Sequence, residues 1–328
     1  MAKKFPSFDE CYHAKPVIEM PENFDTFWEE EILKLKKRPL EPIQKLRLKT
    51  NIAKESFYDI QFRGHLDNYI QGYLILPRKL KKVPLIITLH DYWKEFTLLN
   101  EMNQMISSQN IAHLHLYLQP QEILQQIHEE EKDDPKKEFL FPTLFLDAYK
   151  QSTSHDYGVF LVLDVLRSID FIRLNKNIEH TKVGILGRGL GANLAIFAAA
   201  LRPESIKVLA LERPSLVWME YFIKYSHSQL SKEYQKILQS KKQKVKKIID
   251  SHSIYNDALL VANKIKVPTL ISVGMEDEEH PSYCAFGFFN SIQTDKYMQV
   301  FTDEKQDPDQ RKERTKSLEF LIERLNNY

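Results

Sequence analysis

Residues 182–200, KVGILGRGLGANLAIFAAA, concentrate glycine between a strand-like run and a helix-forming run. Residues 183–186 are apolar and partly β-branched, as in a buried strand. Residues 192–200 are rich in Ala and Leu and contain no breaker, which favours a helix. Four of the nine glycines of the whole chain lie between Gly184 and Gly191. The stretch therefore predicts a strand, a tight turn and a helix in direct succession.

Three interpretations of this turn compete. The first is a nucleophile elbow, G-x-S-x-G, in which Gly189 would stand at the serine position of residues 187–191. The second is a dinucleotide fingerprint formed by Gly187, Gly189 and Ala192, with Glu212 as the ribose-binding acid. The third is a tight turn without chemistry. A single glycine motif does not decide among them, so the rest of the chain must.

Apolar and alternating runs along the chain predict an α/β protein. Strands are expected at 55–62, 69–76, 83–90, 111–118, 206–212, 267–273 and 296–301. The first two alternate and should pair in antiparallel fashion. Helices are expected at 160–174 and 314–325, and near the N-terminus with a stripe of Phe27, Trp28, Ile32 and Leu33. Strands that alternate with helices imply a mostly parallel sheet with helices on both faces.

Composition excludes several classes of function. The 328 residues carry 46 Lys and Arg against 45 Asp and Glu, a net charge of +1, so no bulk field attracts nucleic acid or an anionic membrane. No apolar run approaches the ~20 residues that span a bilayer, and residues 1–13 lack the apolar core of a secretory signal. Only Cys11 and Cys284 are present. We expect a cytoplasmic protein without a disulfide framework.

Several segments, in order, resemble the acetyl xylan esterase/cephalosporin C deacetylase family of α/β-hydrolases. They cover nearly the whole chain: FDTFWEEEILKLKKRPL, LHDYW (the family's HGY motif), HDYGVFLVLDVLRSIDFIR, VGILGRGLGANLAIFAAAL, IYNDALLVANKIKVPTLISVGMED and CAFGFFNSI with KYMQVF. The resemblance implies one α/β-hydrolase domain over 1–328. It also implies an N-terminal helical extension, 1–50. The polar stretch 119–153 and the helical stretch 214–250 are expected to be insertions over the site.

The resemblance also implies which residues would do chemistry. Ester hydrolysis in this fold needs a hydroxyl, an imidazole, a carboxylate and backbone N–H donors. Gly189 stands at the nucleophile position, so the serine hydroxyl is missing. Asp277 keeps the acid position, with nothing left to orient. Asp303 stands at the histidine position, and no histidine follows His280 in the chain. Because an elbow forces its central residue into a strained backbone region, glycine there removes strain and nucleophile together.

Other residues near the expected site are candidates for binding. By family analogy the N–H groups of Tyr92 and Leu190 form the oxyanion hole, and His90 supports the loop that carries Asp91. His280 is a candidate for a relocated base that activates water. Ser282 and Cys284 are candidate substitute nucleophiles at the mouth of the site. The pair His113 and His115, with the acidic run 277–280, is too weak a pattern to predict a metal, and no cofactor is expected.

Three functions follow. The leading hypothesis is a catalytically inactive member of the family with a remaining role in binding or assembly. The second is an active carboxylic-ester hydrolase that uses a non-standard site, and the third is a dinucleotide-binding protein. The resemblance suggests an acetylated sugar or small ester as ligand, and a homo-oligomer built through the N-terminal helix. If the wild-type chain is silent toward p-nitrophenyl acetate and a Gly189→Ser/Asp303→His double variant hydrolyses it, the site is an intact esterase frame whose reactive groups are lost; wild-type turnover would contradict the leading hypothesis.

Overall fold

A nine-stranded sheet runs through the described part of the chain, in the order β1-β2-β3-β5-β4-β6-β7-β8-β9. The computed structural model describes residues 5–48, 54–65, 69–78, 80–97, 99–118, 144, 157–239, 253–302 and 310–327. The strands are β1 (Ile43–Leu48), β2 (Glu55–Arg63), β3 (Tyr69–Pro77), β4 (Val83–Leu89), β5 (Ala112–Tyr117), β6 (Ile178–Arg188), β7 (Ile206–Glu212), β8 (Thr269–Gly274) and β9 (Lys296–Phe301).

The antiparallel strands lie at one end of the sheet and the parallel strands make up the rest. β1, β2 and β3 pair in antiparallel fashion, and β3 pairs antiparallel with β5. From β5 through β4, β6, β7 and β8 to β9, every neighbouring pair is parallel. The predicted mostly parallel α/β sheet is confirmed, as is the antiparallel pairing of the first two predicted strands.

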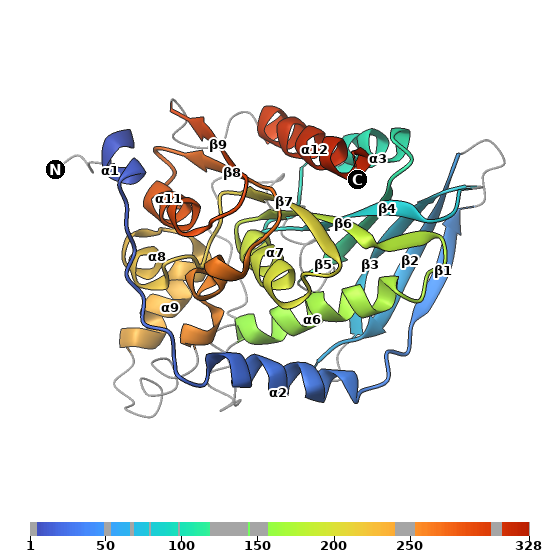
Figure 1. Ribbon diagram of the computed structural model, residues 1–328, viewed down its shortest axis with the longest axis horizontal. Coiled ribbons are helices and arrows are strands. Elements are labelled where there is room, and N and C mark those ends of the chain that lie inside the picture. Colours follow the sequence, from blue (N-terminus) through green and yellow to red (C-terminus); the bar gives the residue numbers. More distant parts are fainter. Residues whose placement is uncertain are drawn as a thin grey trace, which may run out of the picture.

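Helices cover both faces of this sheet (Figure 1). One face carries α2 (Phe24–Lys36), α6 (Tyr157–Ile172) and α7 (Leu190–Leu201); the other carries α3 (Leu99–Ser108) and α12 (Gln310–Asn326). The remaining elements are α1 (Phe8–Tyr12), α8 (Met219–Tyr225), α9 (Gln229–Gln239), η1 (Ser253–Asn256), η2 (Ala258–Lys264) and α11 (Ser282–Ser291). Two apolar clusters fill the two layers, and the smaller packs α3 and α12 on the sheet. None of the helices in the described ranges is long and apolar enough to cross a membrane.

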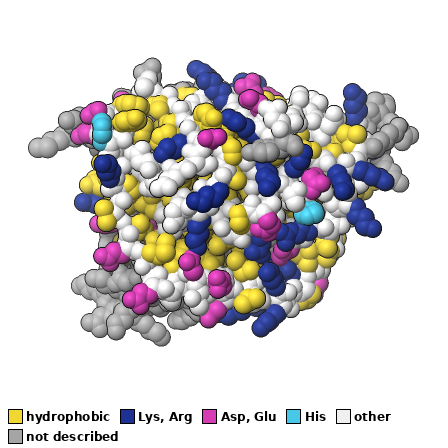
Figure 2. Space-filling model, viewed as in Figure 1, with side chains coloured by type: hydrophobic (Ala, Val, Ile, Leu, Met, Phe, Trp, Pro, Cys, Tyr) yellow, Lys and Arg dark blue, Asp and Glu magenta, His cyan; other side chains and the backbone are white. Residues whose placement is uncertain are grey.

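The surface has both charge signs on the face shown in Figure 2, where Lys and Arg alternate with Asp and Glu. This mixture fits the net charge of +1. Apolar side chains are scattered among the charged ones and do not form one continuous patch on this face.

The N-terminal part of the chain differs from the prediction in two ways. Residues 43–48 form the edge strand β1, so the predicted helical extension 1–50 ends in a strand paired with β2. On α2 the buried side chains are Phe24, Trp28, Glu31 and Leu35, each three or four residues from the next, as a helix face requires. Of the predicted stripe, Trp28 is buried and Phe27 and Ile32 pack partly buried against the core, whereas Leu33 is 56% exposed.

The two predicted insertions are described only in part. Most of 119–153 lies outside the described residues, as does the end of 214–250 with its basic run. Within the described part, 219–225 and 229–239 are helical as expected. Tyr234 and Ile237 are buried there, whereas Leu238 is 40% exposed.

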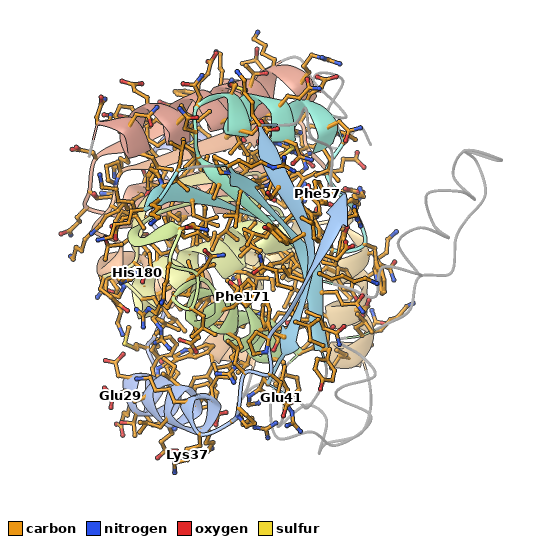
Figure 3. The ribbon with its side chains drawn as sticks, turned by 90° about the vertical axis from the view of Figure 1, so that its right-hand side faces the viewer. Glu29, Lys37, Glu41, Phe57, Phe171 and His180 are labelled. Atoms are coloured by element: carbon orange, nitrogen blue, oxygen red, sulfur yellow. The ribbon has the colours of Figure 1, made fainter. Side chains whose placement is uncertain are left out.

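Figure 3 shows how α2 and α6 meet the sheet: Glu29 and Lys37 lie on the outer side of α2, and Phe171 of α6 lies in the interior. Phe171 stacks on Phe62 of β2 at 5.0 Å between ring centroids. The Trp28 ring lies 5.2 Å from Phe197 of α7. Aromatic contacts thus join α6 to β2 and α2 to α7.

Trp28 should carry much of the attachment of α2. Trp28→Ala deletes a side chain that is only 1% exposed, so we expect urea denaturation to show a loss of about 3–5 kcal/mol in the free energy of unfolding. The matched control on the same helix is Leu33→Ala, which should change that free energy by no more than about 0.5 kcal/mol. Equal losses in the two variants would contradict this packing of α2.

Candidate active site

The turn between β6 and α7 has the backbone of a nucleophile elbow without the nucleophile. Gly189 has φ 52° and ψ −115°, a conformation that side-chain-bearing residues rarely adopt. Its N–H donates to the carbonyl of Glu212 at 2.9 Å. A Cβ placed on Gly191 would lie 2.0 Å from the carbonyl oxygen of Leu89. The glycines therefore allow the first turn of α7 to press against the end of β4, as the sequence predicts for a tight turn.

The carboxylate of Asp91 occupies the predicted oxyanion hole. Its Oδ1 accepts hydrogen bonds from the backbone N–H of Tyr92 at 2.7 Å and of Leu190 at 2.8 Å. A Cβ placed on Gly189 would lie 1.9 Å from the same oxygen and 2.0 Å from the carboxylate carbon. Asp91 thus fills both the hole and the space that a serine side chain would need. The geometry therefore argues against rescue by Gly189→Ser/Asp303→His, because that double variant leaves Asp91 in the same space.

His280 lies between two carboxylates. Its Nε2 is 2.9 Å from Oδ2 of Asp91, and its Nδ1 is 3.3 Å from Oδ2 of Asp277. The backbone N–H groups of His280 and Glu279 each donate to Oδ1 of Asp277 at 2.9 Å, which fixes the loop after β8. The expectation that Asp277 has nothing to orient is therefore wrong. It orients His280, a histidine three residues later, in place of one after β9.

The electrostatics of this triad favour an ion pair. Burial alone would lower the pKa of His280, but the charges and hydrogen bonds of Asp277 and Asp91 outweigh burial and raise the pKa to about 10. Burial would raise the pKa of Asp91, but the charge and hydrogen bond of His280 and the Leu190 N–H lower it to about 2. The pKa of Asp277 likewise lies well below its usual range. At neutral pH the three groups are Asp91⁻, His280⁺ and Asp277⁻.

A buried chain of ion pairs continues behind Asp277. Arg213 donates to Oδ2 of Asp277 at 2.8 Å and to both carboxylate oxygens of Glu313 at 3.2 and 3.3 Å. Arg188 reaches Glu313 at 2.9 Å and lies 3.4 Å from Glu212. Removing one partner from such a buried set costs about 3–5 kcal/mol, since the other charge is left unpaired. The chain links the ends of β6, β7 and β8 to α12.

Glu212 takes part in these buried ion pairs and is not available to bind a ribose. Arg314 donates to its two carboxylate oxygens at 2.8 and 2.7 Å, a bidentate pair. The other requirement of a dinucleotide site is a free helix N-terminus for the pyrophosphate. At α7 that position is taken by the Asp91 carboxylate, bonded to the Leu190 N–H. The geometry therefore does not support the dinucleotide interpretation of the glycine turn.

The remaining histidines near the sheet are structural. His90 Nδ1 donates to the carbonyl of Asp91 at 2.7 Å and its Nε2 accepts the N–H of Leu118 at 2.9 Å, so it supports the loop as expected. His113 and His115 both bond to the Thr88 hydroxyl, at 2.9 and 2.7 Å. Within the described ranges no three His, Cys, Asp or Glu side chains are grouped to hold a metal ion.

The proposed substitute nucleophiles are not at the mouth of the site. Ser282 is 2% exposed, and its hydroxyl lies 3.5 Å from the Cys11 thiol beneath α1. Cys284 is fully buried, and burial raises the pKa of its thiol well above the ordinary value. Asp303, the predicted histidine position, lies outside the described residues.

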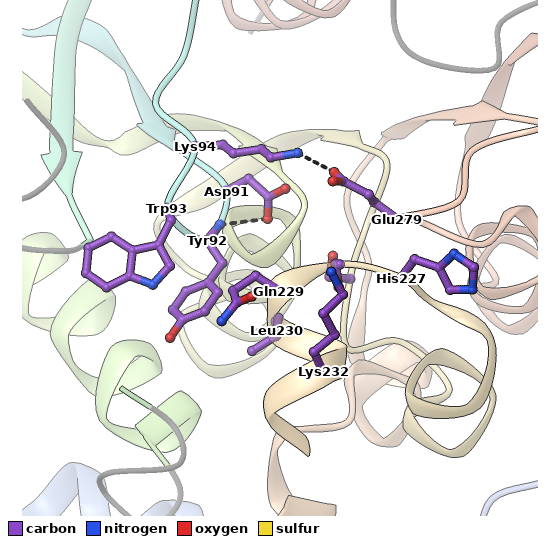
Figure 4. Close-up of a pocket in the computed structure, with 11 residues that line it drawn as sticks. Asp91, Tyr92, Trp93, Lys94, His227, Gln229, Leu230, Lys232 and Glu279 are labelled. Atoms are coloured by element: carbon purple, nitrogen blue, oxygen red, sulfur yellow. Dashed lines mark hydrogen bonds and ion pairs between the residues drawn. The ribbon is translucent and has the colours of Figure 1, made fainter. Parts of the chain in front are cut away.

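A cleft of about 130 Å³ opens beside Asp91 at the carboxyl ends of the parallel strands (Figure 4). Polar and aromatic side chains line it, including Tyr92, Trp93, Lys94, Gln229, Lys232 and Glu279. Lys94 pairs with Glu279 across the opening. The hydroxyl of Tyr92 donates to the buried Glu233 of α9 at 2.7 Å, so the second insertion does lie against the site.

The charge state of His280 gives a direct prediction. Nuclear magnetic resonance of the imidazole nitrogens should show His280 titrating with a midpoint near 10. Asp91→Asn keeps the shape but removes one anion, so the midpoint should fall by about 1–2 units. Glu278→Gln, in the same loop but without contact to the imidazole, is the matched control and should leave it unchanged.

The same ionisation sets a pH dependence of stability. The folded-state pKa lies above the ordinary 6.5, so the pairing stabilises the fold fully below about pH 6.5 and is lost as pH rises to about 10. His280→Gln should flatten the fall in the free energy of unfolding over this interval. A His280 midpoint near 6.5 would contradict the paired geometry.

Known proteins resemble this chain over almost its whole length. A sequence model of acetyl xylan esterase (AXE1) matches residues 2–324. Two solved acetyl xylan esterases superimpose on it. The acetyl xylan esterase from Paenibacillus sp. R4 has a TM-score of 0.77 and 18% sequence identity, over 96% of this chain and 99% of that chain. Acetyl xylan esterase 1 from Thermoanaerobacterium sp. JW/SL YS485 has a TM-score of 0.79 and 16% sequence identity, over 98% of this chain and 99% of that chain.

A more distant likeness marks the general fold. Dienelactone hydrolase from Anabaena variabilis ATCC 29413 gives a TM-score of 0.51 at 16% identity, over 84% of this chain and 99% of that chain. The fold is thus that of α/β-hydrolase esterases. With residues 2–324 matched by the family's sequence model, the chain belongs to the acetyl xylan esterase (AXE1) family of carboxylic-ester hydrolases.

Proposed function

We propose that this member of the family does not hydrolyse acetyl esters and keeps its cleft for binding a small polar ligand. One observation supports the proposal above all: the N–H groups of Tyr92 and Leu190 both bond to the carboxylate of Asp91. Hydrolysis of an ester requires those donors at the oxygen of the substrate carbonyl. The substrate would have to displace an ionised carboxylate that is also paired with His280.

The proposed loss involves the nucleophile and the oxyanion hole, while a histidine and an acid are still paired beside them. Gly189 supplies no hydroxyl, and Asp91 takes the place where the family has the glycine of its HGY motif. His280 and Asp277 remain in the arrangement of a general base with its orienting acid. The carboxylate in the hole resembles a bound acetate product, now supplied by the protein itself.

The lining of the cleft suits a hydroxyl-rich ligand. Lys94, Gln229 and Glu279 offer donors and acceptors, and the largely buried Tyr92 and Trp93 also border the cleft. This is the basis for an acetylated sugar or small ester as the bound ligand. Assembly into a homo-oligomer through α2 is the second part of the proposal, and the exposed Leu33 lies on its outer side. The two buried free thiols, Cys11 and Cys284, suit the reducing cytoplasm.

Hydrolysis of p-nitrophenyl acetate tests the proposal. The wild-type chain should be silent, and so should Gly189→Ser alone, because Asp91 blocks the added side chain. The double variant Asp91→Gly/Gly189→Ser empties the oxyanion hole. It also places a hydroxyl near the position that the Asp91 carboxylate occupies beside His280 in the wild-type chain. We expect it to exceed both single variants by about 10²-fold or more.

A second measurement addresses the binding role, by titrating the wild-type chain calorimetrically with acetylated xylotriose. Wild-type turnover of the ester that is abolished by His280→Gln would overturn the proposed inactivity. Heat of binding without product formation would support the ligand-binding role.

A further inference from the structure

The two oxygens of Asp91 have different surroundings. Oδ1 is held by the N–H groups of Tyr92 and Leu190. Oδ2 faces His280 Nε2 at 2.9 Å. The side chain also lines the 130 Å³ cleft and a second, larger one that His280 and Asp277 border. An ionised carboxylate with one oxygen fixed and the other beside an imidazole has the parts of a covalent nucleophile.

The geometry distinguishes which kind of carbon this carboxylate is able to attack. Attack on an acyl carbon needs a second set of donors for the substrate oxyanion. In the described part of the site, the two N–H groups at the elbow already bind Asp91 itself. Attack on a saturated carbon needs no oxyanion hole, because charge develops on the leaving group. The alkyl ester so formed would have its carbonyl oxygen, Oδ1, already in the hole.

We propose that Asp91 is the nucleophile of an epoxide hydrolysis, with His280 as the base that releases the aspartyl ester. This goes beyond the proposed loss of acetyl-ester hydrolysis, since it assigns a different reaction to the same cleft. Asp91, His280 and Asp277 supply nucleophile, base and orienting acid in direct contact, and the elbow donors serve the second step instead of the first.

The first step opens the ring. Asp91 Oδ2 forms a bond to a ring carbon, the bond from that carbon to the ring oxygen breaks, and the oxygen takes a proton from the Lys232 ammonium. Lys232 lines both clefts, and Figure 4 shows its ammonium end directed toward Asp91 and Glu279. No carboxylate pairs with it among the described residues. Esterification removes the charge of Asp91, so His280⁺ gives up its proton, which returns through solvent to Lys232.

The second step regenerates the site. His280 Nε2 takes a proton from water as the water oxygen bonds to Cγ of Asp91, and the negative charge develops on Oδ1 within the hole. Collapse breaks the bond between Cγ and the alkyl oxygen. The alkyl oxygen takes the proton of the newly formed Asp91 carboxylic acid and becomes the second hydroxyl of a vicinal diol. Asp91⁻ and His280⁺ are restored, and the sum is one epoxide plus one water giving one diol.

The first experiment traps the ester with styrene oxide. His280→Gln should accumulate a mass increase of one epoxide per chain, located by peptide mapping on Asp91, because the second step lacks its base. Asp91→Asn is nearly identical in shape and should form no adduct at that position. Wild type should form diol at least about tenfold faster than Asp91→Asn. Thermal unfolding of each variant checks that it is folded.

The second experiment uses only the wild-type chain, so it does not depend on the folding of a variant. In a single turnover in heavy-oxygen water, the diol should be unlabelled and the label should appear in Asp91, because the diol oxygen comes from Oδ2. Label in the first-turnover diol, or no diol above Asp91→Asn together with no adduct in folded His280→Gln, overturns the inference.

The two proposals fail separately. Hydrolysis of p-nitrophenyl acetate by the wild-type chain would overturn the proposed inactivity whatever happens to styrene oxide. Silence toward both compounds, with no adduct on Asp91, would overturn only the epoxide chemistry.

Discussion

The hydrogen bonds from Tyr92 and Leu190 to one oxygen of Asp91 are the contact on which the site depends. They join the loop after β4 to the first turn of α7, at the place where the partial positive charge of the helix favours an anion. A serine at the elbow cannot coexist with this contact, since a Cβ on Gly189 would overlap the carboxylate. Glycine at 189 and aspartate at 91 are therefore structurally coupled, because the carboxylate fills the space that a side chain at the elbow would need.

Charge neutrality explains how so many ionised groups stay buried around that contact. The acids are Asp91, Asp277, Glu212 and Glu313, and the bases are His280, Arg213, Arg188 and Arg314. The set has four groups of each sign, and each charge has an opposite partner at 3.4 Å or less. In a low-dielectric interior such a chain is stable only when complete. It holds the loops after β6, β7 and β8 in place against α12, which keeps His280 pointed at Asp91.

The sequence predicted the fold well and the site only in part, for physical reasons. The strand-like runs 206–212 and 296–301 were located to the residue, although only the first is buried along its length and the second is half-buried. β1 was missed because it is a short edge strand in which only Leu46 and Leu48 alternate with the polar Lys45 and Arg47, too few residues to form a clear pattern. The loss of the serine was visible at Gly189. The position of the Asp91 carboxylate was not visible, because its contact with the Leu190 N–H joins residues 99 positions apart; the only signal was aspartate in place of the HGY glycine. His280 was considered as a relocated base, but its contact with Asp91 was not predicted, since that contact joins residues 189 positions apart.

A crystal structure of Asp91→Gly soaked in sodium acetate, beside the wild-type chain treated alike, tests the central claim most directly. If the carboxylate of Asp91 is an internal occupant of the hole, acetate should bind in the variant with one oxygen between the N–H groups of Tyr92 and Leu190 and the other at His280. In the wild-type chain the Asp91 carboxylate should be there and acetate absent. A wild-type structure with Asp91 turned away and acetate in the hole would contradict the account.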